Sequence, residues 1–146
     1  MAEWSMDLSK YAEKKKVEIK EVRKSYAFAL YSSIVKKTPV DTGRARANWN
    51  VSVGSPDTST TENTTTTPMS KSKMPDPKGD ESIFISNNLP YITTLEYGGF
   101  PNPPKKDGGK TVNGFSKQAP NGMVGVTLAN NEAIFDSAVR AVRGSK

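Results

Sequence analysis

Apolar and polar residues follow two different periods along this chain, and the first period is helical. Between Ser5 and Lys37, apolar side chains recur every three or four positions, and most lysines and glutamates fall outside that stripe. The spacing predicts one long helix over residues 5–37, with Ser5 as its N-cap. The stripe comprises Leu8, Tyr11, Ile19, Val22, Tyr26, Leu30 and Ile34.

The first half of this predicted helix has few apolar residues for an intramolecular core, and Lys15 interrupts its stripe. The whole helix would also be about twice the usual length. Two interpretations stay open: this end projects and docks on a neighbouring subunit, or it is solvated and frayed. The run Lys14-Lys15-Lys16 favours a solvated face over a phosphate clamp, because no aromatic residues interleave with it.

The second period is two, and it follows a chain reversal. Pro39 displaces the residue before it from helical geometry, so the long helix is expected to stop there. Asp41 and Gly43 are typical of a tight turn. From residue 44 to residue 53, polar and apolar side chains alternate without a break. This alternation predicts a strand with one buried face and one solvated face.

The predicted strand gives individual side chains a place. Trp49 is expected in the core, together with the other apolar residues of its face. Arg44 and Arg46 are expected on the solvated face, with Asn48 beside them. Both arginines are candidates to form an ion pair with Glu96 or with another subunit.

The rest of the chain predicts shorter elements between polar segments. Residues 54–80 are rich in Ser and Thr and predict an extended, mobile loop or a long polar hairpin tip, which a partner would order. Residues 99–118, rich in Pro, Gly and Lys, predict a second loop. The predicted elements are a strand at 81–86 covered on both sides, a helix at 91–97 between Pro90 and Gly98, a strand at 123–128, and a helix from Asn130 or Asn131 that buries Ile134, Phe135, Ala138 and Val142.

These elements predict a single α+β domain over residues 1–146. A small antiparallel or mixed sheet of three or four strands is flanked by the long N-terminal helix and by a shorter C-terminal helix, with long flexible loops between them. A chain of 146 residues can build one modest core. The low apolar fraction of 34% indicates that part of the length is not packed.

Composition then narrows the chemistry. The chain has no Cys and no His, which removes thiol nucleophiles, imidazole bases and nearly every transition-metal site. We therefore expect no enzyme activity, no cofactor and no metal. No apolar run approaches the ~18 residues of a membrane span, and the first residues are unlike a signal peptide, so we expect no membrane contact and a cytoplasmic origin. The net charge of +6 and a pI near 9.5 permit contact with nucleic acid or with an acidic protein surface.

Candidate reactive groups are sparse. Asp41, Glu96 and Asp136 are the acidic residues nearest to predicted structure, and nothing in the sequence pairs two of them for acid–base work. The run Gly108 to Thr111 matches the end of a phosphate-binding loop but lacks its first glycine and its leading strand. Lysines of the second loop are candidate contacts to a phosphate backbone or an acidic subunit, with a solvated loop as the alternative. Candidate partner or DNA contacts are Arg46, Lys105, Lys106 and Lys110.

Three stretches are more specific in combination than any one alone. They are Thr38 to Arg44 with Asn48-Trp49, Ser86 to Tyr91 leading to Leu95 to Gly98, and Gly114 to Val124. Their order resembles the tail-completion or neck proteins of long-tailed bacteriophages, a head-tail joining family that includes the minor tail protein Z of phage lambda. The resemblance covers roughly residues 30–130.

The resemblance implies a tail-terminator-like fold and a structural role in the virion, with the protein in the host cytoplasm during assembly. It implies a ring, a hexamer, at the head-proximal end of the tail. There the protein would contact copies of itself, the tail terminator ring, the head connector or stopper proteins, and DNA in the channel non-specifically. Fold and assembly roles, not catalysis, are implied for Asp41, Gly43, Arg44, Asn48, Trp49, Tyr91, Glu96, Tyr97, Gly98, Gln118, Pro120, Gly122 and Met123.

Two other functions stay open at this point. A basic nucleic-acid-binding module would remain monomeric and would bind duplex with an affinity that falls steeply with salt. A tail terminator or another connector-ring protein would share the assembly role but occupy a different level of the particle.

Overall fold

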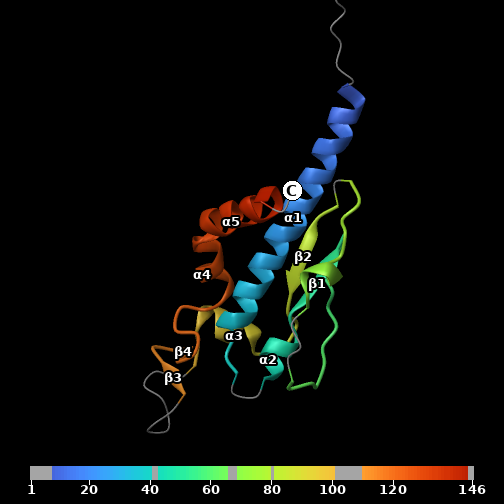
Figure 1. The fold of residues 1–146 in the computed structure, drawn as a ribbon. Coiled ribbons are helices and arrows are strands. Elements are labelled where there is room, and N and C mark those ends of the chain that lie inside the picture. Colours follow the sequence, from blue (N-terminus) through green and yellow to red (C-terminus); the bar gives the residue numbers. More distant parts are fainter. Residues whose placement is uncertain (1–7, 41–42, 66–68, 80, 101–109, 145–146) are drawn as a thin grey trace, which may run out of the picture.

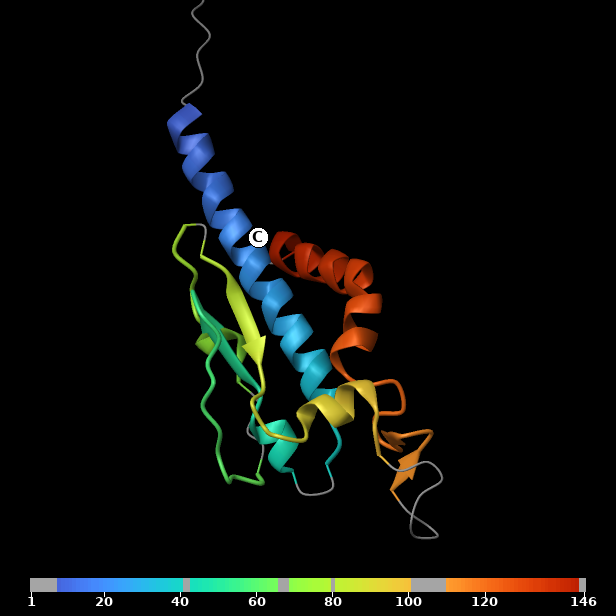
Figure 2. The same cartoon turned by 180° about the vertical axis from the view of Figure 1, so that it is seen from behind.

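A single long helix, α1 (Leu8–Lys37), organises the molecule, and the other elements are arranged along its C-terminal part (Figure 1). The computed structural model describes residues 8–40, 43–65, 69–79, 81–100 and 110–144. The views in Figures 1 and 2 agree that α4 and α5 lie on one side of α1 and a β-ribbon on the other. The predicted long helix is confirmed from Leu8 to Lys37, and the expected N-cap Ser5 lies outside the described residues.

The β-ribbon consists of β1 (Asn50–Val53) and β2 (Ile83–Ser86), which pair antiparallel with Asn50 opposite Ser86 and Val53 opposite Ile83. The predicted strand at 81–86 is thus confirmed over its last four residues. All eight residues of the ribbon are half-buried, and Val51 and Ile85 pack against the core. The prediction that the strand at 81–86 is covered on both sides is therefore wrong, because no residue of β2 is fully buried.

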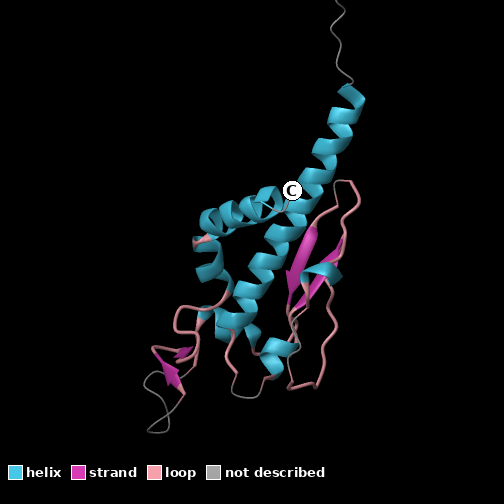
Figure 3. Ribbon diagram, viewed as in Figure 1, coloured by secondary structure: helices cyan, strands magenta, loops and turns pink. Residues whose placement is uncertain are grey.

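A second, separate hairpin is made by β3 (Thr111–Val112) and β4 (Phe115–Ser116), so the prediction of a loop over 99–118 is wrong for these residues. Asn113-Gly114 joins the two strands, a pair that suits a tight hairpin turn. The described strands therefore form two antiparallel pairs, as Figure 3 shows, and the prediction of one sheet with three or four strands is wrong. The chain is nevertheless α+β, with a long N-terminal helix and a C-terminal helix.

The first half of the strand predicted after the reversal is helical. Arg44–Ala47 forms α2, and only residues 50–53 are extended. Ala45, Asn48 and Trp49 are the buried side chains, and their spacing of three and four belongs to a helical turn. Ala and Arg are also strong helix formers. Asn48 is 1% exposed, so its predicted place on a solvated face is wrong, whereas the burial of Trp49 is confirmed.

The strand predicted at 123–128 is also wrong, because Val124–Ala129 forms α4. Met123 and Thr127, four positions apart, are completely buried, while Leu128 is half exposed. Six alternating residues are too few to separate a strand from one and a half turns of helix. The Thr127 hydroxyl lies 3.0 Å from the hydroxyl of Ser33, which fixes α4 against α1.

The short helix predicted after Pro90 is confirmed as α3 (Ile92–Tyr97), and Gly98 follows as its C-cap. Leu95 is buried, and Tyr91 and Ile92 pack against the core from the start of the helix. The chain therefore turns inward at Tyr91, as its spacing predicts.

The C-terminal helix α5 (Asn131–Gly144) begins at one of the two predicted caps. Ala138 and Val142 are buried against α1, as predicted, and Ile134 is half-buried. Phe135 is 42% exposed, so the prediction of its burial is wrong. Its ring lies nearly perpendicular to that of Tyr26, with the two ring centroids 5.2 Å apart.

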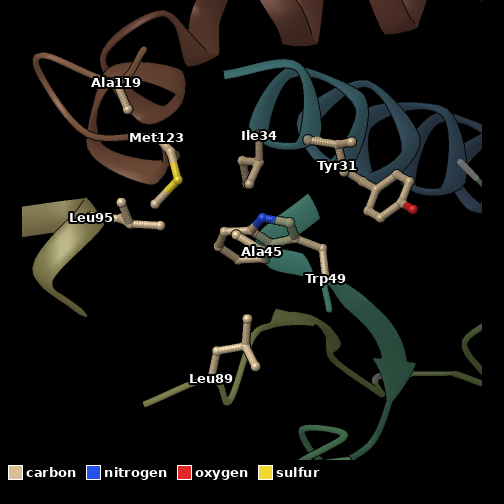
Figure 4. Packing of buried hydrophobic residues seen from close by; sticks show 9 residues of the cluster. Tyr31, Ile34, Ala45, Trp49, Leu89, Leu95, Ala119 and Met123 are labelled. Carbon is tan, nitrogen blue, oxygen red and sulfur yellow. The ribbon is translucent and has the colours of Figure 1, made fainter. Parts of the chain in front are cut away.

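The hydrophobic core lies where α1, α2, α3 and the segment before α4 meet (Figure 4). Trp49 is at its centre, with Tyr31 and Ile34 of α1 on one side and Leu89 on the other. The residues of the cluster are Tyr31, Ile34, Val35, Ala45, Trp49, Leu89, Leu95, Ala119 and Met123.

The Ser/Thr-rich segment 54–80 is held by contacts within the chain over its described residues. Asn50 Nδ2 donates to the carbonyls of Asp57 and Ser59 at 3.4 and 3.0 Å, and Met74 is 3% exposed beside a short 3-10 turn, η1 (Lys71–Lys73). The expectation that only a partner would order this segment is therefore wrong for those residues.

Among the described helices, none is both long and apolar enough to cross a bilayer.

Candidate functional site

Several of the residues predicted to have fold and assembly roles make hydrogen bonds within the chain, and Asn48 is the first example. Its Nδ2 donates to the carbonyls of Arg44 at 2.8 Å and Thr61 at 3.0 Å, while its Oδ1 accepts from the Thr61 amide at 2.8 Å. One side chain thus closes α2 and fixes the Ser/Thr-rich segment beside it. Because Asn48 is 1% exposed and both polar atoms of its side chain are paired, the role of Asn48 is architectural.

Trp49 is anchored by a hydrogen bond as well as by packing. Its Nε1 donates to Thr38 Oγ1 at 2.8 Å, and the Thr38 hydroxyl donates to the Ile34 carbonyl at 2.7 Å. Thr38 is 1% exposed. The end of α1 is therefore tied to the centre of the core. From the sequence, Thr38 was interpreted only as the residue at which the helix stops. Its hydroxyl lies four residues after Ile34, a spacing that predicts a hydrogen bond to the last helical turn.

Glu96 caps α4 from another part of the chain. Its Oε1 accepts hydrogen bonds from the amides of Met123 and Val124 at 2.9 and 2.7 Å, and its Oε2 accepts from the Gly125 amide at 2.9 Å. The first amides of a helix have no partner within it, and a carboxylate there also opposes the positive end of the helix dipole. Glu96 is therefore the N-terminal cap of α4, and its predicted pairing with Arg44 or Arg46 is wrong.

Gly122 makes this cap possible. Its φ is +82°, and a Cβ built there would lie 2.5 Å from the Glu96 carbonyl oxygen. The Pro120–Gly122 bridge holds the same tight turn. Glycine, which has no Cβ, is thus the only residue that fits where α3 and α4 approach each other.

We expect Gly122→Ala to lower the free energy of unfolding by more than about 2 kcal/mol. The alanine would be strained at this positive φ, and its Cβ would also clash with the Glu96 carbonyl oxygen, so the two costs add. Urea denaturation monitored by circular dichroism measures the change. Gly144→Ala is the matched control, because a Cβ at Gly144 meets nothing within 4 Å. Equal effects for the two variants would refute the role assigned to Gly122.

The two arginines of α2 take partners that the alternating pattern did not suggest. Arg46 Nε donates to the Thr38 carbonyl at 2.7 Å and Nη2 to the Lys36 carbonyl at 2.8 Å, so Arg46 caps the C-terminus of α1. Arg44 Nη2 lies 2.9 Å from Glu62 Oε1 in a surface ion pair. Neither arginine is a bare cationic site for DNA.

A double-mutant cycle between Arg44 and Glu96 is expected to be additive, since the two residues act in different contacts. The cycle between Arg44 and Glu62 should give a coupling below about 1 kcal/mol, because Glu62 is largely exposed. Denaturation in urea of the single and double alanine variants measures both values. Coupling to Glu96 larger than coupling to Glu62 would contradict these contacts.

The other predicted site residues divide into scaffold and surface. Gln118 Oε1 accepts from the Val40 amide at 2.7 Å, and Met123 is completely buried in the core. Gly43 and Gly98 have positive φ angles at helix ends. Tyr97 is 78% exposed and Lys110 lies on the surface. Of the predicted site residues, Asp41, Lys105 and Lys106 lie outside the described part of the chain.

No reactive constellation stands out in the described part of the chain. Groups of three or more potential metal ligands are absent among the described residues. The pKa of Asp57 is lowered by hydrogen bonds from the hydroxyl and amide of Ser59, and that of Asp76 by the ammonium of Lys24. Both carboxylates are at the surface. Their lowered pKa values keep them ionised, which is the opposite of what a general acid needs.

An open groove lies between α1 and α5, here called the α1–α5 groove. It has a volume of about 840 Å³. Its floor is apolar and includes Ile19, Val22, Phe135 and Val139, of which Ile19 is 60% and Phe135 42% exposed. Its rim is charged, with arginines outnumbering carboxylates. The groove has the composition of a protein-binding surface.

Comparisons of this chain with protein-family models, with curated proteins and with solved structures give no significant match. The described residues form an α+β scaffold with an open, largely apolar groove between α1 and α5.

Proposed function

We propose that this chain is a structural subunit of a ring at the head-proximal end of a long-tailed bacteriophage tail, where it completes the tail and joins it to the head. The observation that carries this proposal is that the three resembling stretches meet in one scaffold. Asn48, Trp49, Glu96 and Gln118 all direct their polar atoms into contacts within the chain. Such residues preserve a shape for assembly.

The shape also supports assembly. In both ribbon views the N-terminal part of α1 extends beyond the body of the molecule, with no other element beside it. A protruding helix on one side and an open apolar groove elsewhere are unlike surfaces, and unlike surfaces can join successive copies head to tail. This arrangement supports the interpretation in which the helix end docks on a neighbouring subunit.

The charge distribution is compatible with a channel through which DNA moves. The net charge is +6, yet Arg44, Arg46, Arg23 and Arg143 are engaged with carbonyls or carboxylates of the chain. A channel wall should attract phosphate only weakly, since tight binding would hold the DNA in place. The partners in this proposal are copies of the chain, the terminator ring and the head connector or stopper proteins.

The proposal is tested in a phage that encodes this chain by inactivating its gene. We expect filled heads and separate tails, with infectivity restored when the full chain is supplied in trans. Attached, infectious particles in its absence would contradict the proposal. A monomeric chain that binds duplex DNA tightly and with steep salt dependence would instead identify a nucleic-acid-binding module.

A further inference from the structure

The α1–α5 groove leaves large apolar side chains uncovered. Ile19 projects from α1 and Phe135 from α5, and each keeps a large part of its side chain exposed. The Tyr26 ring contacts the Phe135 ring in a T-shaped arrangement, yet Phe135 stays 42% exposed. Large uncovered aliphatic and aromatic side chains within a charged rim are typical of a binding surface.

We propose that the α1–α5 groove of one copy binds residues 3–8 of a second copy, with Trp4 and Leu8 as the apolar anchors. The inference rests on the proposed function, because a ring requires a contact between unlike surfaces of successive subunits. It adds to that function the contact that joins the subunits.

The chemistry of residues 3–8 matches the groove. Trp4 and Leu8 are one helical turn apart in sequence, the spacing by which an amphipathic segment places two anchors in a groove. Glu3 and Asp7 flank these anchors with negative charge. A tryptophan is also the side chain that contributes most often to the centre of a protein interface.

The rim of the groove has the complementary charge. Arg23, Arg140 and Arg143 outnumber Glu18 and Asp136 along it. Arg23 already donates to the carbonyls of Gly79 and Glu81, and Arg143 lies 3.3 Å from Glu18. Arg140 is exposed on α5 and is the arginine best placed to meet an acidic residue of the incoming segment.

The length of the chain favours a second copy over the same copy. Helix α1 begins at Leu8, and Val22 in the groove is 14 residues along it, about 21 Å at the helical rise. Four extended residues before Leu8 carry the Trp4 backbone back by at most about 14 Å. The segment therefore falls short of the middle of its own groove, whereas a neighbouring copy has no such limit.

The test uses disulfide cross-linking, because the natural chain has no Cys. Ser5→Cys and Asp136→Cys place one thiol beside the anchors and one on the rim. We expect the double variant to give a ladder of covalent oligomers on mild oxidation, and an equal mixture of the two single variants to give a dimer. Adding Trp4→Ala should reduce the yield by about tenfold or more, as loss of a central tryptophan does.

Val112→Cys in place of Asp136→Cys is the matched control, since Val112 is exposed on β3 at the far end of the molecule. A yield no greater than with this control overturns the inference. A cross-linked monomer without a ladder also overturns it, because the segment would then fill its own groove.

Cross-linking, combined with the location of labelled protein in particles, separates this inference from the proposed function. Labelled protein found at the neck of particles, without cross-linking through Asp136→Cys, would refute the groove contact and leave the proposed function standing. A cross-linked ladder from a protein that never enters a particle would refute the proposed function and support the contact between copies.

Discussion

Replacement of Trp49 by alanine is expected to lower the free energy of unfolding by about 3–5 kcal/mol, the usual range for removing a large aromatic from a core. Trp49 lies at the centre of the cluster between Ile34 and Leu89, and its Nε1 is paired with Thr38. The variant loses both packing and this hydrogen bond. Urea denaturation monitored by circular dichroism measures the difference.

Two further variants divide that loss. Trp49→Phe keeps an aromatic ring but removes the donor to Thr38, and Thr38→Val keeps the volume but leaves the indole N–H of Trp49 without its acceptor. Each should cost about 1–3 kcal/mol. A loss below about 1 kcal/mol for Trp49→Ala would contradict the central place of Trp49 in this core.

The second large effect is expected at Glu96. Glu96→Ala removes the acceptor of three amide hydrogen bonds at the start of α4, and we expect a loss of about 2–3 kcal/mol, the scale of a charge-assisted bond in a part-buried site. Thermal and urea denaturation give the value. The helical signal of α4 should fall with it.

Glu96→Gln and Glu132→Ala provide the controls. Glutamine keeps one carbonyl oxygen for the amides, so its loss should be smaller than that of alanine. Glu132 lies exposed in the first turn of α5 and should cost less than about 1 kcal/mol. Equal losses for Glu96→Ala and Glu132→Ala would show that Glu96 is not the cap of α4.

Periodicity over long stretches predicted the helices best. The stripe from Leu8 to Ile34 extends over several turns, and the predicted stripe from Ile134 to Val142 extends over more than two, so the helical period fits both. The strand ending at Ser86 and the helix ending at Gly98 were predicted from short segments, because turn residues mark their limits.

Short alternating segments misled the prediction for a physical reason. Arg44–Ala47 is a single turn, and Val124–Ala129 is one and a half turns, so alternation and helical spacing select overlapping residues. In both segments, hydrogen bonds to residues far away in the sequence select the helical conformation. Asn48 binds Thr61 across the Ser/Thr-rich segment, and Glu96 caps α4 from 27 residues upstream of Met123. No local pattern contains either contact.

The candidate site was predicted only in part. Family resemblance selected Asn48, Trp49, Glu96 and Gly122, and each proves to hold two parts of the chain together. The α1–α5 groove was not predicted, because Phe135 fits the buried face of α5 by spacing. Which side chains of α5 are covered depends on how this helix packs against α1, and that contact joins segments far apart in the sequence.

The central claim is that this chain works as an assembled part of a phage particle, next to copies of itself. Imaging of intact particles that carry a labelled version of the chain tests it most directly. We expect the label as a ring at the junction of head and tail. Label on the capsid shell, along the tail tube or only on free protein would contradict the account.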